Sequence, residues 1–277
     1  MKDSTQPIGF FDSGIGGLTV ARRVMEELPY ENTVYFGDSA RVPYGSKSTD
    51  TVLFYTRQAV RFLEAKNVKL IIIACNTASA VALDYARTLT SLPVLGVIEP
   101  GAHGAVATTR NRRIGVIGTE GTVRSGAYQS AITELASDIQ VYAKACPLLV
   151  GFAEEGLSAH PATVMITREY LADLLSESID ALIMGCTHYP FLEPAIREVT
   201  GEDVVLVDPG MSTARYARRI LEEQNMLNTQ RLTARHEYYL SDFPHKFVEI
   251  GQRFLGRTME HVEKITLEEL SDRADHR

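Results

Sequence analysis

Two short apolar runs, each followed closely by a cysteine, constrain the fold of this chain more than any other feature. The runs cover residues 70–73 and 181–184, and Cys75 and Cys186 each follow after one small residue. Aliphatic runs of this length, bounded by polar residues, are typical of strands buried on both faces of a parallel sheet. We therefore expect each cysteine at the carboxyl end of a buried strand, the edge at which open α/β sheets bind their ligands.

The rest of the chain alternates strand-like runs with amphipathic helical stretches, which is the pattern of α/β proteins. Its 277 residues are many for a single core and suit two domains of ordinary size. The predicted strands are 8–11, 33–36, 70–73, 94–98, 114–118, 181–185, 204–207 and 237–240, and the predicted helices include 18–28, 50–66, 212–224 and 244–254.

Three landmarks of the first part of the chain recur in the second part, in the same order and at nearly equal distances. The pairs, with their separations, are 8–13 with 114–119 (106 residues), Cys75 with Cys186 (111) and Pro100-Gly101 with Pro209-Gly210 (109). Such regular offsets indicate an internal duplication. We predict two pseudo-symmetric α/β domains with mostly parallel sheets that face each other across a cleft. Residues 1–98 with 209–277 would form the first domain, and residues 99–208 the second.

The position of the two cysteines favours a chemical role. A thiol at the start of a helix ionises more easily, because the helix dipole and its free amides stabilise the thiolate. A single cysteine at a strand end is more often a small buried apolar residue, but two of them, each followed by polar residues, indicate a pair of proton-transfer groups. Cys146 provides the contrast, since Pro147 and aliphatic residues follow it, and we expect it in the core.

Opposed thiols would suit one type of reaction. Inverting a carbon next to a carboxylate requires a base on one face and a proton donor on the other, and facing domains would bring Cys75 and Cys186 to opposite sides of a ligand. Neighbouring ionisable groups are Asp12, which ends the first strand, and His188, two residues after Cys186. A lone carboxylate at a strand end is often only a helix cap, and an isolated histidine is often structural. Glu154 and the adjacent glutamate at 155 follow an apolar stretch and are further candidates.

Four stretches of the chain carry a resemblance to a known family. They read DSGIGGLTV at 12–20, GDSARVPYG at 37–45, ACNTASA at 74–80 and GCTHYP at 185–190. Together they resemble the glutamate racemases of the aspartate/glutamate racemase superfamily, and the resemblance extends over residues 8–256. It implies a cofactor-independent and metal-independent interconversion of L- and D-glutamate that supplies D-glutamate for peptidoglycan. In that family the first cysteine takes the α-proton from D-glutamate and the second from L-glutamate.

The resemblance also implies roles for individual residues. Cys75 and Cys186 correspond to the two catalytic cysteines, and Asp12, Glu154 and His188 fall at positions of auxiliary acid/base residues. The residues implied as substrate contacts are Asp12, Ser13, Pro43, Tyr44, Gly45, Asn76, Thr77, Thr119, Thr122, Thr187 and His188. Helix-start amides and hydroxyls can hold a doubly carboxylated ligand without an arginine. His188 favours glutamate, because similar aspartate racemases usually carry an acid there.

A dinucleotide-binding site is an alternative interpretation of the first motif. Gly14 and Gly16 open a helix after a strand, and Asp38 follows Gly17 by 21 residues, the spacing of an acid that binds a ribose. The third glycine of this motif, however, would fall at Thr19. The alternative also leaves both cysteine strands unexplained.

Two further alternatives involve a metal or a bound cofactor. Cys75, Cys186 and His188 carry good zinc-ligand groups, so a non-catalytic metal or small-ligand binding protein is one reading, although no CxxC pair is present. A pyridoxal enzyme is disfavoured, because no lysine lies within the cysteine motifs or the Asp12 motif to form the Schiff base.

Composition bounds the compartment and the partners. The net charge is −7 with no cluster of basic residues, which argues against nucleic acid as a partner. The first residues lack an apolar signal-peptide region, and no apolar stretch approaches the ~18 residues of a membrane span. Three cysteines without a CxxC pair suit a reducing compartment, so we expect a cytoplasmic protein. The expected partner is a small-molecule substrate; the oligomeric state is open, with a homodimer as one candidate.

Overall fold

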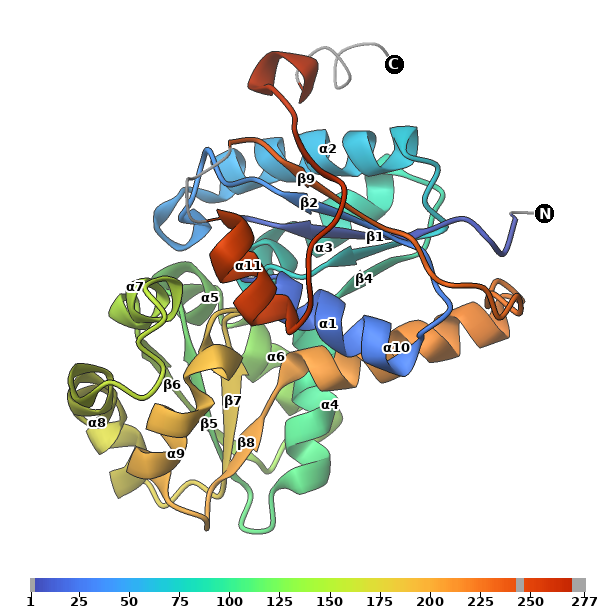
Figure 1. Ribbon diagram of the computed structural model, residues 1–277. Coiled ribbons are helices and arrows are strands. Elements are labelled where there is room, and N and C mark those ends of the chain that lie inside the picture. The colour runs from blue at the N-terminus through green and yellow to red at the C-terminus, as the bar shows by residue number, and fades with distance from the viewer. Residues whose placement is uncertain (1–2, 243–246, 271–277) are drawn as a thin grey trace.

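Two separate parallel sheets organise the chain, and helices cover both faces of each (Figure 1). The computed structural model describes residues 3–242 and 247–270. In order across the first sheet, the strands are β10 (Val262–Lys264), β9 (His236–Leu240), β2 (Thr33–Gly37), β1 (Ile8–Asp12), β3 (Leu70–Ile73) and β4 (Val94–Gly96). In the second sheet they are β6 (Gln140–Ala145), β5 (Arg113–Gly118), β7 (Ala181–Gly185) and β8 (Val205–Val207). This confirms the predicted α/β class.

The second sheet repeats the topology of the first. Its order β6-β5-β7-β8 corresponds strand for strand to β2-β1-β3-β4, and β3 and β7, which precede the two cysteines, occupy equivalent places. The repeated Pro-Gly landmarks also meet: a Cβ at Gly101 would lie 3.1 Å from Cβ of Pro209. The predicted duplication therefore agrees with the strand order, and the exact domain boundaries stay a prediction.

Alternating side chains of the first sheet fill two different cores. In β1, Phe10 belongs to the core that also contains Leu18, whereas Phe11 belongs to the core that contains Phe62. Successive side chains of a strand point to opposite faces, so both faces of β1 are buried, as a parallel sheet between helices requires.

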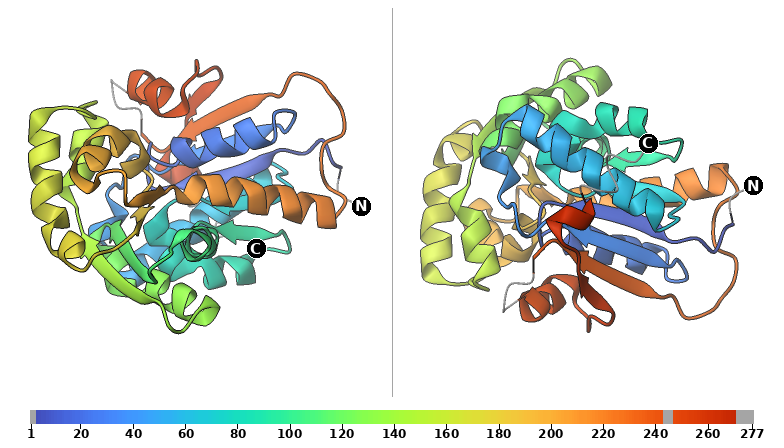
Figure 2. Two further views of the ribbon diagram at one scale, coloured as in Figure 1. Left: turned by 90° about the horizontal axis from the view of Figure 1, so that it is seen from below. Right: turned by 90° about the horizontal axis from the view of Figure 1, so that it is seen from above.

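The helices between the strands form the outer layers. They are α1 (Leu18–Glu27), α2 (Thr49–Ala65), α3 (Asn76–Leu89), α4 (Ile98–Thr108), α5 (Glu120–Ser125), α6 (Ala127–Leu135), α7 (Leu148–Glu154), α8 (Pro161–Ser176), α9 (Glu193–Thr200), α10 (Pro209–Glu223) and α11 (Phe247–Leu255), with short 3₁₀ turns at Tyr44–Ser46 and Tyr189–Leu192. We call the part of the chain around the six-stranded sheet the first half and the part around the four-stranded sheet the second half. Helix α10 packs against α1 of the first half and α4 of the second and so joins them; Figure 2 shows it beside α1 in the view from below. None of the helices in the described part of the chain is long and apolar enough to cross a membrane.

Most predicted elements are present, with some differences at their ends. Strand β9 pairs with β2, so the predicted return of the C-terminal part to the first sheet is confirmed. The predicted strand 94–98 is too long, since β4 ends at Gly96 and Ile98 already begins α4. Helix α11 begins at Phe247, and residues 244–246 of the predicted helix lie outside the described residues.

Candidate active site

The ends of strands from both sheets border one cavity of about 380 Å³. The sulfur-bearing residues Cys75 and Cys186 both line it, one from each half. The other predicted site residues that line it are Ser13, Pro43, Tyr44, Gly45, Asn76, Thr77, Thr119, Glu154, Thr187 and His188. The structure thus brings together residues that are more than a hundred positions apart in sequence.

Cys75 stands between strand β3 and helix α3, at the N-cap position of the helix. It is 5% exposed, and its thiol donates a hydrogen bond to Oγ of Ser13 at 3.5 Å. Burial, and next the charge of the nearby Asp12, raise the pKa of Cys75 to about 12, against the opposing effect of the helix amide at Ala78. The expectation that its place at a helix start eases ionisation is therefore wrong for Cys75, because burial outweighs the helix amide and keeps the thiol protonated at neutral pH.

Cys186 stands after β7 and has a histidine and a glutamate as its acid/base neighbours. Sγ of Cys186 lies 3.8 Å from Nδ1 of His188, and Nε2 of His188 donates to Oε1 of Glu154 at 3.0 Å. Burial alone would lower the pKa of His188, but the hydrogen bonds with Cys186 and Glu154 outweigh it and raise that pKa to about 10. The hydrogen bond from His188 in turn lowers the pKa of Glu154. The imidazole is thus cationic at neutral pH next to the second thiol.

Asp12 lies behind the cavity wall and is fully buried. Its carboxylate accepts from the amide of Gly14 at 2.9 Å and from Oγ1 of Thr187 at 3.5 Å. Burial raises the pKa of Asp12, while the charge of His188 opposes this effect. The charge of Asp12 therefore acts on Cys75, and the hydrogen bond from Thr187 connects its carboxylate to the loop that carries Cys186.

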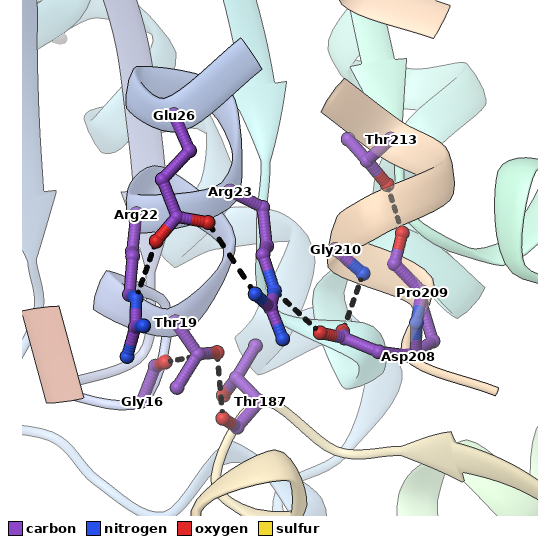
Figure 3. Close-up of polar contacts among 10 residues, drawn as sticks. All are labelled: Gly16, Thr19, Arg22, Arg23, Glu26, Thr187, Asp208, Pro209, Gly210 and Thr213. Atoms are coloured by element: carbon purple, nitrogen blue, oxygen red, sulfur yellow. Dashed lines mark hydrogen bonds and ion pairs between the residues drawn. The ribbon is translucent and has the colours of Figure 1, made fainter. Parts of the chain in front are cut away.

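The glycine-rich turn after β1 receives the loop that carries Cys186. A Cβ at Gly16 would lie 2.3 Å from Oγ1 of Thr187 and 2.5 Å from Nδ1 of His188, so only glycine fits this close approach. At the start of α1, Oγ1 of Thr19 donates to the carbonyl of Thr187 at 2.8 Å (Figure 3). The turn is therefore filled by protein, and the alternative in which it cradles a dinucleotide phosphate is wrong.

Asp38 also differs from what the dinucleotide alternative needs. It is fully buried, and its carboxylate accepts from Arg41 at 2.7 Å, from the hydroxyl of Tyr44 at 2.5 Å and from Ser241 at 2.7 Å. No ribose could reach it. Its function is to brace the segment that places Tyr44 and Gly45 in the cavity wall.

Three threonine hydroxyls join the two halves beside the cavity. Oγ1 of Thr77 lies 2.9 Å from that of Thr119 and 3.2 Å from that of Thr122, which itself lies 3.1 Å from Thr119. Thr77 and Thr119 line the cavity, whereas Thr122 is 1% exposed and lies behind them. Nearby, the hydroxyl of Tyr128 donates to Oδ1 of Asn76 at 2.7 Å, which fixes the orientation of that amide.

Six cavity residues were not among the predicted ones: Val42, Ser46, Glu120, Pro147, Val150 and Gly151. Three of them belong to the start of α7 and follow Cys146, which is fully buried, as predicted. This segment also follows a strand end, since β6 ends at Ala145, but β6 lacks the unbroken apolar run that marked the other two strands in the sequence. Among the described residues, no group of three or more histidine, cysteine, aspartate or glutamate side chains is arranged to hold a metal ion.

Sequence comparison identifies the class and the family. The pattern of the Asp/Glu/hydantoin racemases matches residues 18–217, and with this fold it defines the chain as a racemase, an enzyme of the isomerase class. A glutamate racemase from Syntrophus aciditrophicus is 48% identical to it over 94% of this chain and 97% of its own length. The chain therefore belongs to the Asp/Glu/hydantoin racemase family.

Solved structures agree with this assignment. A crystal structure of glutamate racemase from Francisella tularensis in complex with D-glutamate matches with a TM-score of 0.89 and 39% identity, covering 96% of this chain and 99% of its own. A glutamate racemase isoform from Bacillus anthracis matches with a TM-score of 0.91 and 38% identity, covering 95% and 98%. Because both matches cover at least 95% of this chain, the similarity includes both of its sheets.

Proposed function

We propose that this enzyme interconverts L- and D-glutamate by a two-base proton transfer between Cys75 and Cys186, without a cofactor or a metal. The observation that carries the proposal is that both thiols, from equivalent strand ends of the two repeated sheets, line the same cavity. The similar racemases from Syntrophus and Francisella, which act on or bind glutamate, support this choice of substrate.

In the proposed reaction, the thiolate of Cys186 takes the α-proton of L-glutamate, and the thiol of Cys75 delivers its proton to the opposite face. The C–H bond on one face is broken and a new one is formed on the other, so the product is D-glutamate. Cys75 then carries the negative charge, and Cys186 is a thiol. The reverse direction starts from this form, which is why each cysteine must serve as acid in one direction and as base in the other.

The surrounding groups support this exchange of roles. A cationic His188, held by Glu154, stabilises negative charge on the Cys186 side. The carbanion formed from glutamate spreads its charge into the α-carboxylate, and the free amides at the start of α3 favour that charge. The hydroxyls of Ser13, Thr77 and Thr119 can donate hydrogen bonds to the carboxylates of glutamate without bringing in further charge.

The cellular role that we propose is the supply of D-glutamate for peptidoglycan in the cytoplasm. It rests on the family membership and on the substrate named for the similar enzymes. Complementation of a bacterial strain that requires added D-glutamate tests it, since growth without the supplement should depend on both cysteines.

Hydrogen exchange in deuterated water tests the reaction itself. The purified enzyme, with chelator present and no cofactor added, should replace the α-hydrogen of either glutamate enantiomer with deuterium and abolish optical activity. D- and L-aspartate, run in parallel, should exchange far more slowly. If folded enzyme leaves both glutamate enantiomers unchanged, or prefers aspartate, the proposal is wrong.

A further inference from the structure

The loop with Cys186 and His188 belongs to the second half, yet an element of the first half holds its backbone. Thr19, in the first turn of α1, is buried, and its Oγ1 lies 2.8 Å from the carbonyl oxygen of Thr187, the residue between Cys186 and His188 (Figure 3). The same hydroxyl lies 2.9 Å from the carbonyl of Gly16. Because a hydroxyl has one proton, it donates to one of these carbonyls at a time.

A second contact comes from α11, which also belongs to the first half. The ring of Phe254 is 2% exposed and meets the imidazole of His188 edge-on, with ring centroids 5.7 Å apart and planes at 84°. Phe254 also packs on Phe191, which follows in the same loop, with centroids 4.8 Å apart. Helix α11 lies beside α1 at the junction of the halves (Figure 1), so both contacts come from one side.

We infer that Thr19 and Phe254 are positioning residues for the Cys186 side of the reaction. Neither lines the cavity, and each acts through the loop: Thr19 through the carbonyl of Thr187, and Phe254 through the ring of His188. Proton transfer depends steeply on the placement of donor and acceptor, and a displacement of about 1 Å can cost roughly a hundredfold in rate. The inference rests on the proposed racemisation, since it assigns the two residues to one of its two proton transfers.

This assignment has a kinetic signature that a general loss of folding would not produce. The two enantiomers of glutamate have equal energy, so kcat/KM must fall by the same factor in both directions whatever the variant. If Thr19 and Phe254 position only the Cys186 loop, however, their substitution raises only the barrier for proton transfer to and from Cys186. The primary isotope effect on kcat/KM should therefore increase with α-deuterated L-glutamate, whose proton Cys186 removes, and decrease with α-deuterated D-glutamate.

The main experiment compares Thr19→Val with Thr19→Ser. Valine keeps the shape but removes the hydroxyl, leaving the buried carbonyl of Thr187 without this donor, and we expect kcat/KM to fall roughly tenfold. Serine keeps the hydroxyl and should restore both the rate and the isotope effects to near the wild-type values. Phe254→Leu, which retains apolar volume, should change the isotope effects in the same direction. Ser13→Ala, on the Cys75 side, should change them in the opposite direction.

An activity-independent measurement completes the test. Alkylation by iodoacetamide, followed at each cysteine by mass spectrometry, should show a severalfold change in the rate at Cys186 relative to Cys75 in Thr19→Val but not in Thr19→Ser. Equal isotope effects in all variants, or the same alkylation ratio in valine and serine variants, would overturn the inference. Failure of the wild-type enzyme to racemise glutamate would instead refute the proposed function, and the alkylation ratio would still decide whether Thr19 holds the loop.

Discussion

The Cys75 side and the Cys186 side of the cavity are equivalent in topology but different in chemistry. Each cysteine follows the third strand of its repeat, and each is almost completely buried. Cys75 has a neutral hydroxyl from Ser13 as its neighbour, and burial together with Asp12 raises its pKa to about 12. Cys186 has an imidazole whose pKa is raised to about 10. The duplicated sheets therefore determine where the sulfurs lie, and the loops determine how protons are distributed between them.

This difference separates the roles of the two thiols under the proposed function. Burial and the charge of Asp12 disfavour a thiolate at Cys75, whereas Sγ of Cys186 lies 3.8 Å from the cationic His188. We therefore expect His188 to stabilise Cys186 as the base that takes the α-proton of L-glutamate. The form that accepts D-glutamate places negative charge on Cys75, near Asp12, so the enzyme's amides at the start of α3 and the hydroxyl of Ser13 have more to contribute there.

Removing either thiol should lower the rate of racemisation more than any other substitution, and the loss should be similar for the two sides. We expect Cys75→Ala and Cys186→Ala each to lower kcat for racemisation by at least about 1,000-fold in both directions. Each thiol acts as the base in one direction and as the acid in the other, so neither direction can proceed without both. Polarimetry with each enantiomer measures this. Cys146→Ala is the matched control: Cys146 is buried outside the cavity, so activity should remain while the thermal midpoint falls. Equal losses in all three variants would contradict the two-base assignment.

Filling the glycine turn should disturb the Cys186 side alone. In Gly16→Ala, the added Cβ would overlap Thr187 and His188, so the loop must move away from the cavity. We expect kcat to fall on the order of 100-fold, the effect of a displacement near 1 Å, with the Cys75 alkylation rate retained. Circular dichroism and the melting temperature would separate this displacement from unfolding. A near-normal rate would mean that the loop tolerates movement.

The sequence predicts the repeated part of this architecture better than the part that differs between the halves. Cys75 and Cys186 could be placed at strand ends because their strands are buried on both faces and give unbroken apolar runs. Strand β6 was not predicted, because its residues are only partly buried and show no such run. The lining residues Pro147 and Val150 were missed for a related reason: aliphatic residues after Cys146 indicated core, whereas α7 turns one of its faces to the cavity.

The choice of the glutamate next to His188 could not be made from sequence, because adjacent residues near the end of a helix point in different directions. The structure places Glu154 against His188 and leaves Glu155 exposed. Likewise, the sequence contains no sign that Asp12 lies behind the cavity wall with Thr187 donating to its carboxylate, and its predicted contact with substrate stays a prediction. Contacts between halves depend on how the two sheets meet, which local patterns do not encode.

Changing Glu154 should shift the pH dependence of activity and of stability through its effect on His188. A folded-state pKa of about 10 for His188 means that its charge stabilises the native enzyme fully below about pH 6.5 and that this contribution is lost as the pH rises through 10. In Glu154→Gln the anionic acceptor is gone, so the pKa of His188 falls and the alkaline limb of activity should move to lower pH by on the order of one unit. Unfolding measured from pH 7 to 10 should depend less on pH. Glu155→Gln should leave both profiles unchanged, and a shift there instead would reassign the acceptor.

The smallest effect on activity is expected from the contacts among Thr77, Thr119 and Thr122, which involve neither thiol. Thr122 does not line the cavity, but its hydroxyl bonds to those of Thr77 and Thr119, which do. Thr122→Val should loosen this wall and weaken glutamate binding in ground and transition states alike, so KM should rise about threefold to tenfold with kcat nearly unchanged. Thr122→Ser should behave as wild type, and the isotope effects with the two enantiomers should stay as they are. A change confined to one enantiomer's isotope effect would mean that this wall, too, supports only one of the two proton transfers.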